Sequence, residues 1–210
     1  MKLKKRILGL LLAFVLVIVP FTEASAATGT PLFKKNLTWN IENIHYYVGG
    51  QASTFSSQIA AAANNWVYTG HGYNKLYPNT QTTNITLSTV DIFGYTPSSA
   101  SSVLGYTSFY TRVNGVATQV DPDVKDWLFA EIYLNKALIT QTTYKQYGYS
   151  FSYNQWVQGI VAHEMGHAFG LAHNNTNRQS IMCQTGAPGS GRNVYTVQKV
   201  DSDAFNKKYP

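Results

Sequence analysis

The sequence is poor in cysteine. Cys183 is the single cysteine among 210 residues, so the chain cannot form an internal disulfide. A disulfide-stapled miniature fold is therefore excluded, and stability must come from core packing or from a bound metal. We expect Cys183 to be a small buried hydrophobic residue.

Charged residues are also scarce, at 12% of the chain, with 16 Lys and Arg against 10 Asp and Glu for a net charge of +6. No stripe of Lys and Arg interleaved with aromatic residues is present. Such a stripe is what binding to a phosphate backbone requires. The sequence therefore gives no support to a nucleic-acid-binding role.

Long apolar runs are missing except near the start. Residues 7–21 are uncharged, follow a basic stretch and precede Ala24 and Ala26. The run is short for a membrane span, whereas this order is typical of a secretory signal peptide. We predict a signal peptide over 1–26, although an uncleaved anchor is the alternative. Cleavage would remove four basic residues and one glutamate, leaving a net charge of +3.

The remaining 184 residues suit one domain. We expect a secreted, extracellular and bacterial protein, monomeric and without stable membrane association. Hydrophobic periodicity predicts strands and helices of an α+β fold, and the family resemblance described below implies that they form a twisted mixed sheet with two long helices. The strands are expected over 37–48, 85–90, 103–110 and 129–135, and the helices over 55–67, 153–169 and 197–208. Ser53 or Thr54 is the expected N-cap of the first helix.

The second helix has clear boundaries. Ser152 and Gln155 form the S-x-x-Q pattern of a capping box. Gly170 follows the last apolar position, and glycine adopts the left-handed conformation that ends many helices. We therefore expect the helix to end at Gly170.

This helix contains the sequence His163-Glu164-Met165-Gly166-His167. Residues four apart project from the same helix face, so His163 and His167 can bind one metal ion. Catalytic zinc takes three protein ligands and leaves a fourth position for water. His173, beyond the turn at Gly170, is the expected third ligand. Glu164 is the expected general base, which would take a proton from water and pass it to the leaving amine.

The combined H-E-x-x-H-x-x-G-x-x-H pattern is specific, with a chance frequency of about one in 10⁵ chains of this length. A purely structural zinc site is the open alternative. Structural sites, however, usually close the fourth position with a cysteine or another histidine.

The string HEMGHAFGLAH resembles the metzincin clan of zinc peptidases, and the chain around it resembles the matrixin-type members. Downstream, Ser180-Ile181-Met182 is similar to the Met-turn, whose methionine lies beneath the metal. The resemblance implies a catalytic domain over 27–210, with an upper part over 27–173 and a lower part over 174–210. It also implies one catalytic Zn²⁺, an active-site groove between the parts and an extended peptide substrate bound antiparallel to the strand at 103–110.

The sequence departs from the family in two ways. No cysteine precedes the first strand, so the propeptide cysteine that silences matrixin zymogens has no counterpart between Ala27 and that strand. Vertebrate matrixins also hold a second, structural zinc, yet His45 and His71 are the only histidines outside the motif. We therefore interpret both histidines as ordinary polar residues.

The aspartates at 121, 123 and 126 form a cluster around Pro122. Carboxylate oxygens are ligands that calcium prefers, so a Ca²⁺ site is one interpretation. A solvated turn is the other, because Asp and Pro are common turn formers.

Together these features predict a secreted zinc-dependent endopeptidase acting on proteins or peptides. The competing hypothesis is a secreted binding or adhesion module that kept the fold and the zinc but has no turnover. Glu164 argues against that hypothesis, since a module freed from catalysis would not need this carboxylate.

Overall fold

The computed structural model describes residues 29–72, 74–76, 79–185 and 191–210. The predicted signal peptide therefore lies outside the described residues. Within them, no helix is long and apolar enough to span a membrane. The described residues are α+β, as the hydrophobic pattern predicts, but they form a six-stranded mixed sheet and four α-helices where four strands and three helices were expected.

The sheet has the strand order β2-β1-β3-β6-β4-β5. Its strands are β1 (His45–Val48), β2 (Thr80–Thr82), β3 (Val90–Tyr95), β4 (Gly105–Val113), β5 (Val116–Val120) and β6 (Phe129–Asn135). The first three strands and β6 are parallel, whereas β4 runs antiparallel to β6 and β5. The first half of β4 pairs with β6 but not with β5, and this part of the strand borders a cleft.

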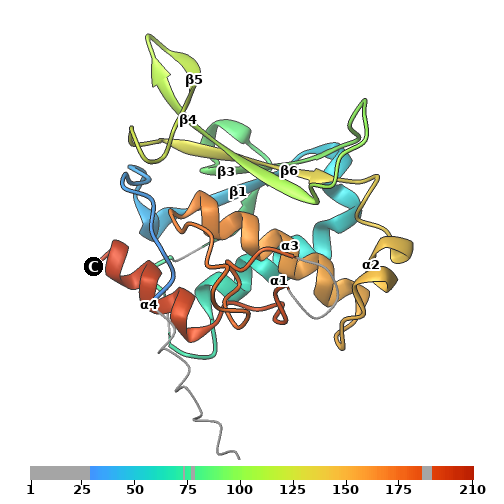
Figure 1. Ribbon diagram of the computed structural model, residues 1–210. Coiled ribbons are helices and arrows are strands. Elements are labelled where there is room, and N and C mark those ends of the chain that lie inside the picture. Colours follow the sequence, from blue (N-terminus) through green and yellow to red (C-terminus); the bar gives the residue numbers. More distant parts are fainter. Residues whose placement is uncertain (1–28, 73, 77–78, 186–190) are drawn as a thin grey trace, which may run out of the picture.

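Both long helices cover the same face of the sheet. They are α1 (Ser56–Val67) and α3 (Tyr153–Ala168), and Figure 1 shows them lying side by side beneath the strands. Trp66 of α1 donates a hydrogen bond from Nε1 to the carbonyl of Ala162 at 2.9 Å. The alternating residues Ala130, Ile132 and Leu134 of β6 are fully buried toward the helices. This apolar layer fixes α3 against the sheet.

Two shorter helices complete the fold. The helix α2 (Gln141–Tyr147) precedes α3, and α4 (Lys199–Lys208) ends the chain. Three 3₁₀ turns occupy Ile41–Asn43, Gly50–Phe55 and Ile85–Leu87. The C-terminal region from 174 onward contains α4 and, in its other described residues, no helix or strand.

Several sequence-based boundaries were wrong. The strand expected over 37–48 is regular only from His45, and the strand expected over 85–90 begins at Val90. Asn84 explains the second error, because its side chain accepts a hydrogen bond from the Thr86 N–H and starts a 3₁₀ turn. Ser53 and Thr54 do not cap α1; they lie in the 3₁₀ turn that runs into it.

Candidate metal centre

The helix α3 carries three of the four predicted functional side chains. His163, Glu164 and His167 are all buried, with no more than 9% of each residue exposed. The helix starts at the predicted capping box, in which the Gln155 N–H donates to Ser152 Oγ and the Ser152 N–H donates to Gln155 Oε1. Apolar residues surround most of α3, so packing on both sides holds the polar residues in place.

Backbone carbonyls orient the two helical imidazoles. Nδ1 of His163 lies 2.8 Å from the carbonyl oxygen of Ile181, and Nδ1 of His167 lies 2.8 Å from that of Leu171. A carbonyl oxygen only accepts, so both Nδ1 atoms carry the proton. Both Nε2 atoms therefore present lone pairs to the space between the rings.

His173 brings a third lone pair to the same space. Nε2 of His167 lies 3.2 Å from Nε2 of His163 and 3.1 Å from Nε2 of His173. Converging lone pairs repel one another unless a cation lies between them. Among the described residues, these histidines are the group of three that could hold a metal ion. Nitrogen ligands in this number fit zinc with one position left open.

The turn after α3 places His173. Gly170 has φ +94°, the left-handed conformation predicted from the sequence, and the Leu171 N–H donates to the Gly166 carbonyl at 2.9 Å. A side chain at Gly170 would also collide with Lys208 of α4. The chain therefore reverses within a few residues and returns toward the helix face.

Burial keeps the histidines in the form that binds metal. Desolvation lowers the pKa of His163 well below its ordinary value and lowers that of His167 to about 4. It also lowers the pKa of His173. Neutral imidazole is the ligand form, so the site is ready for a cation at neutral pH.

Glu164 lies beside the histidines and is held by β4. Its Oε2 accepts a hydrogen bond from the Thr107 hydroxyl at 2.8 Å, and the same hydroxyl lies 3.0 Å from the Glu164 carbonyl oxygen. Burial raises the pKa of Glu164 to about 7, although the Thr107 hydrogen bond and the Arg192 charge oppose this rise. A carboxyl group with such a pKa can both take up and release a proton near neutral pH.

A family model for the matrixins matches residues 31–210, which include all of these residues. The chain belongs to the matrixin family. This assignment supports a zinc metallopeptidase and agrees with the converging histidines. No curated protein matches the chain. One solved structure, the GM1-bound form of the ECX AB5 holotoxin, is similar at 15% identity and a TM-score of 0.43, covering 86% of this chain and 78% of that one.

The predicted Met-turn of this matrixin lies directly against α3. Met182 is fully buried, and a Cβ atom at Gly166 would overlap its sulfur atom and lie 3.0 Å from the Trp66 ring. Glycine at 166 therefore lets the Met182 side chain lie against the helix, on the turn that carries His163 and His167.

Asp201 of α4 supports the Met-turn. Its carboxylate accepts a hydrogen bond from the Ile181 N–H at 2.8 Å and another from the Thr30 hydroxyl at 2.7 Å, and it also contacts the Ser180 hydroxyl. Asp201 is fully buried, and desolvation raises its pKa. Sequence patterns did not single out this residue, because Thr30 and Ile181 are distant from it in the chain.

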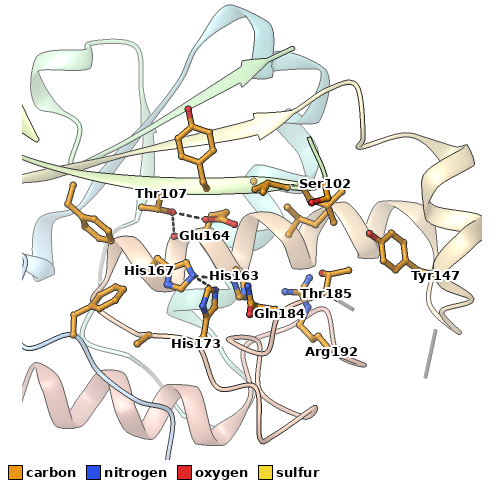
Figure 2. Close-up of a pocket in the computed structure, with 18 residues that line it drawn as sticks. Ser102, Thr107, Tyr147, His163, Glu164, His167, His173, Gln184, Thr185 and Arg192 are labelled. Atoms are coloured by element: carbon orange, nitrogen blue, oxygen red, sulfur yellow. Dashed lines mark hydrogen bonds between the residues drawn. The ribbon is translucent and has the colours of Figure 1, made fainter. Parts of the chain in front are cut away.

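The histidines and Glu164 line a cleft of about 830 Å³. Figure 2 shows His163, His167 and His173 grouped on one side of Thr107 and Glu164, with Gln184, Thr185 and Arg192 farther along the cleft and Tyr147 beyond them. Thr107 and Arg192 were not predicted as site residues. Neither belongs to a sequence motif, and only the fold brings them to the cleft.

The other candidate residues lie away from this cleft. The aspartates are engaged by backbone N–H groups: that of Asp123 donates to Asp121, that of Lys34 to Asp123, and that of Asn36 to Asp126. These contacts suit a turn that anchors the N-terminal segment. Calcium binding there remains a prediction, and an unchanged melting temperature on adding calcium to chelated protein would contradict it.

Proposed function

We propose that this matrixin is a zinc-dependent endopeptidase that hydrolyses peptide bonds in extended chains. The observation that supports the proposal most is the convergence of three histidine Nε2 atoms beside the buried carboxylate of Glu164. His163, His167 and His173 would hold the metal through Nε2. When bound there, zinc would supply Lewis-acid chemistry, polarising the scissile carbonyl and lowering the pKa of a water molecule.

Glu164 is the proposed general base and acid. Its carboxylate would take the proton of the attacking water and then give it to the leaving amine. The Thr107 hydroxyl fixes the orientation of Oε2 at 2.8 Å. Gly105 gives the side chain room, because a Cβ atom there would lie 3.1 Å from Glu164 Cγ and 3.2 Å from Oε1. Both β4 residues therefore act as positioning residues.

The free edge of β4 is the proposed substrate platform. Gly105–Ser108 pair with β6 on one side, whereas β5 pairs only with Phe109–Val113 in the part of the chain that the structure describes. The carbonyls of Leu104 and Tyr110 accept bonds from the β6 side. Because hydrogen-bonding directions alternate along a strand, Gly105 and Thr107 present their backbone groups to the cleft. An extended peptide can add to this edge.

Antiparallel binding would fix the direction of the substrate. Along the cleft, Phe109 packs near Phe33, which packs against His167, whereas Gly105 adjoins Glu164. Going from Gly105 to Phe109 thus follows α3 from Glu164 to His167. A substrate running the opposite way would place the residues on the carboxyl side of its scissile bond near Gly105 and the N-terminal half of α3.

Secretion is part of the proposal. It is supported by the basic start, the apolar run at 7–21 and the small residues at Ala24 and Ala26. N-terminal sequencing of protein from the culture medium should begin at Ala27. Protein retained in the membrane with its start intact would contradict secretion.

The deciding experiment compares the wild-type chain over 27–210 with the Glu164→Ala variant. Zinc content and cleavage of a mixture of denatured proteins are measured with and without a chelator. We expect one zinc per chain in both proteins, and cleavage that is lost with the chelator and in the variant. Bound zinc without any cleavage by the wild type would favour the binding module. Absence of zinc would contradict the metal centre itself.

A further inference from the structure

Arg192 is a buried arginine in the wall of the cleft. Only 3% of the residue is exposed. Its guanidinium lies against α3, since a Cβ atom at Gly159 would be 3.4 Å from Nη2. Gly159 lies about one helical turn before His163. Figure 2 shows Arg192 beside Thr185 on the side of the histidines that faces Tyr147.

Among the described residues this guanidinium forms no ion pair within 4.0 Å, although the carboxylates of Glu164 and Asp201 are near enough to influence its charge. The cleft lining contains one acidic residue, Glu164, whose Oε2 is bound by Thr107. Arg192 donates a hydrogen bond from Nη1 to the Ile181 carbonyl at 3.2 Å, the same oxygen that orients His163. A guanidinium has five N–H donors, and the described residues provide this one acceptor for them.

The cleft lining also contains Leu104, Tyr147, Ile160 and Thr185, which carry no charge, and Figure 2 shows Thr185 beside Arg192. A buried guanidinium with no directly bonded carboxylate is costly, and a carboxylate entering this pocket would offset that cost with charge-assisted hydrogen bonds. A neutral side chain of similar size would form weaker bonds, and a lysine side chain would be repelled.

We propose that Arg192 is a specificity-determining residue that selects an aspartate or glutamate side chain on the carboxyl side of the scissile bond. The inference rests on the proposed endopeptidase function and on antiparallel binding to β4. In that direction the first residue after the scissile bond lies at the Gly105 and Gly159 end of the cleft, where Arg192 is placed. The expected substrates are therefore chains with acidic residues at that position.

The test uses the zinc-loaded wild-type chain and matched peptides that differ only at the residue after the scissile bond, with Glu, Gln, Leu or Lys. We expect kcat/KM for the Glu peptide to exceed that for the Gln peptide about ten- to a hundredfold, as one charge-assisted contact can provide. In Arg192→Gln this ratio should fall to about one, and in Arg192→Lys it should stay above one.

Arg178→Gln is the matched control. Arg178 lies in the same C-terminal region and donates from Nε to the Gly191 carbonyl at 2.8 Å, but it does not line the cleft. Its variant should keep the wild-type ratio. Zinc content and melting temperature show whether each variant is folded. If Arg192→Gln does not fold, the wild-type ratio and Arg192→Lys still decide the question.

A second readout separates this inference from the proposed function. Binding of the same peptides, fluorescently labelled, is measured with zinc-loaded Glu164→Gln protein. Cleavage of all peptides with equal kcat/KM and equal binding would overturn the role of Arg192 and leave the peptidase intact. No cleavage by the wild type, with the Glu peptide still bound more tightly than the Gln peptide, would overturn the peptidase and support the acidic subsite. Equal binding would reject the subsite in either case.

Discussion

The two walls of the cleft are built in different ways. One wall is α3, a single capped helix whose buried face carries His163, Glu164 and His167. We call the described residues 174–185 and 191–198 the C-terminal wall; they contain no regular element apart from the last of them, the N-cap of α4. This wall is held by dispersed polar contacts, such as the 3.0 Å bond from the Asn174 N–H to the Met182 carbonyl.

The two walls are proposed to have different roles: α3 carries the groups for the chemical step, and the C-terminal wall carries the residue for substrate selectivity. On α3, helical periodicity alone fixes the spacing between His163 and His167, so the groups proposed to bind metal and move protons need no distant partner to be brought together. The C-terminal wall supplies Met182 and Arg192, whose positions depend on contacts distant in the sequence. We expect perturbations of α3 to affect turnover or global stability and perturbations of the C-terminal wall to affect local order and substrate choice.

Zinc removal should have the largest effect, because the ion would join His173, beyond the end of α3, to the two helical histidines. Chelation should abolish cleavage. It should also lower the melting temperature, since free zinc at about a thousand times its Kd adds ~4 kcal/mol to folded-state stability. Hydrogen exchange should rise mainly around His173 and the C-terminal wall. Equal increases in hydrogen exchange along α3 and the C-terminal wall would contradict the expectation that α3 is held independently of the metal.

Asp201→Ala should cause the largest loss of stability by a single substitution. It would leave the buried Ile181 N–H and the Thr30 and Ser180 hydroxyls without their acceptor. We expect a loss of about 2–4 kcal/mol in the free energy of unfolding, measured by urea titration. Asp203→Ala is the control on the same helix, because its ion pair with Lys199 is exposed and should change stability by about 0.5 kcal/mol or less.

Gly166→Ala tests the point where the two walls touch. Alanine favours a helix over glycine by about 1 kcal/mol, but its methyl group would overlap the Met182 sulfur. We expect a net destabilisation of about 1–3 kcal/mol from overpacking. The same substitution in a Met182→Ala background should cost much less. Equal costs in both backgrounds would show that the contact between the walls does not limit residue 166.

The residues of α3 were predictable because their determinants are local. The capping pair Ser152 and Gln155, the i, i+4 histidines and the left-handed Gly170 are all separated by a few positions, and the structure places each as the pattern indicates. The strand at 129–135 was predicted at its observed bounds for the same reason. Its alternation is local and one of its faces is buried.

The rest depended on contacts between distant segments. Thr107 meets Glu164 across 57 positions, and Asp201 meets Thr30 across 171. The strand β5 was missed although Asn114 and Gly115, with φ of 52° and 81°, form the two-residue turn that a hairpin requires. That signal was available in the sequence. For Arg192, by contrast, no local pattern distinguishes a residue lining the cleft from a surface arginine.

The outer face of the sheet contacts neither wall of the cleft, so a substitution there serves as a control for the comparison of the two walls. Asp91 is 4% exposed, lies opposite Glu131 in the strand register and faces away from α3, while Ser88 donates a hydrogen bond to it. Burial raises its pKa to about 6, the Ser88 bond opposes the rise, and Glu131 adds to it. Arg112 lines the same small pocket.

Because this pKa lies above the ordinary value of 3.8, the folded state holds the Asp91 proton more tightly than the unfolded state. The contribution of Asp91 to stability is therefore present below pH ~4 and is lost as the pH rises through about 6. Asp91→Asn should abolish this loss and raise stability at pH 7 by ~3 kcal/mol at most, measured by urea unfolding at several pH values. Turnover should not change, because Asp91 lies outside the cleft.

Ser152→Ala should have the smallest effect and tests the independence of the α3 ligands. The substitution removes the acceptor of the Gln155 N–H at the start of the helix, about three turns before His163. We expect a loss of about 1 kcal/mol in the free energy of unfolding, with zinc content and kcat unchanged. The reason is that packing of Trp66 and Met182 against the middle of α3 holds the ligand-bearing turns even when the first turn frays. A fall in kcat at full zinc occupancy would instead mean that the first turn of α3 determines the positions of His163 and His167. The positions of these histidines would then depend on more than the local packing of the helix around them.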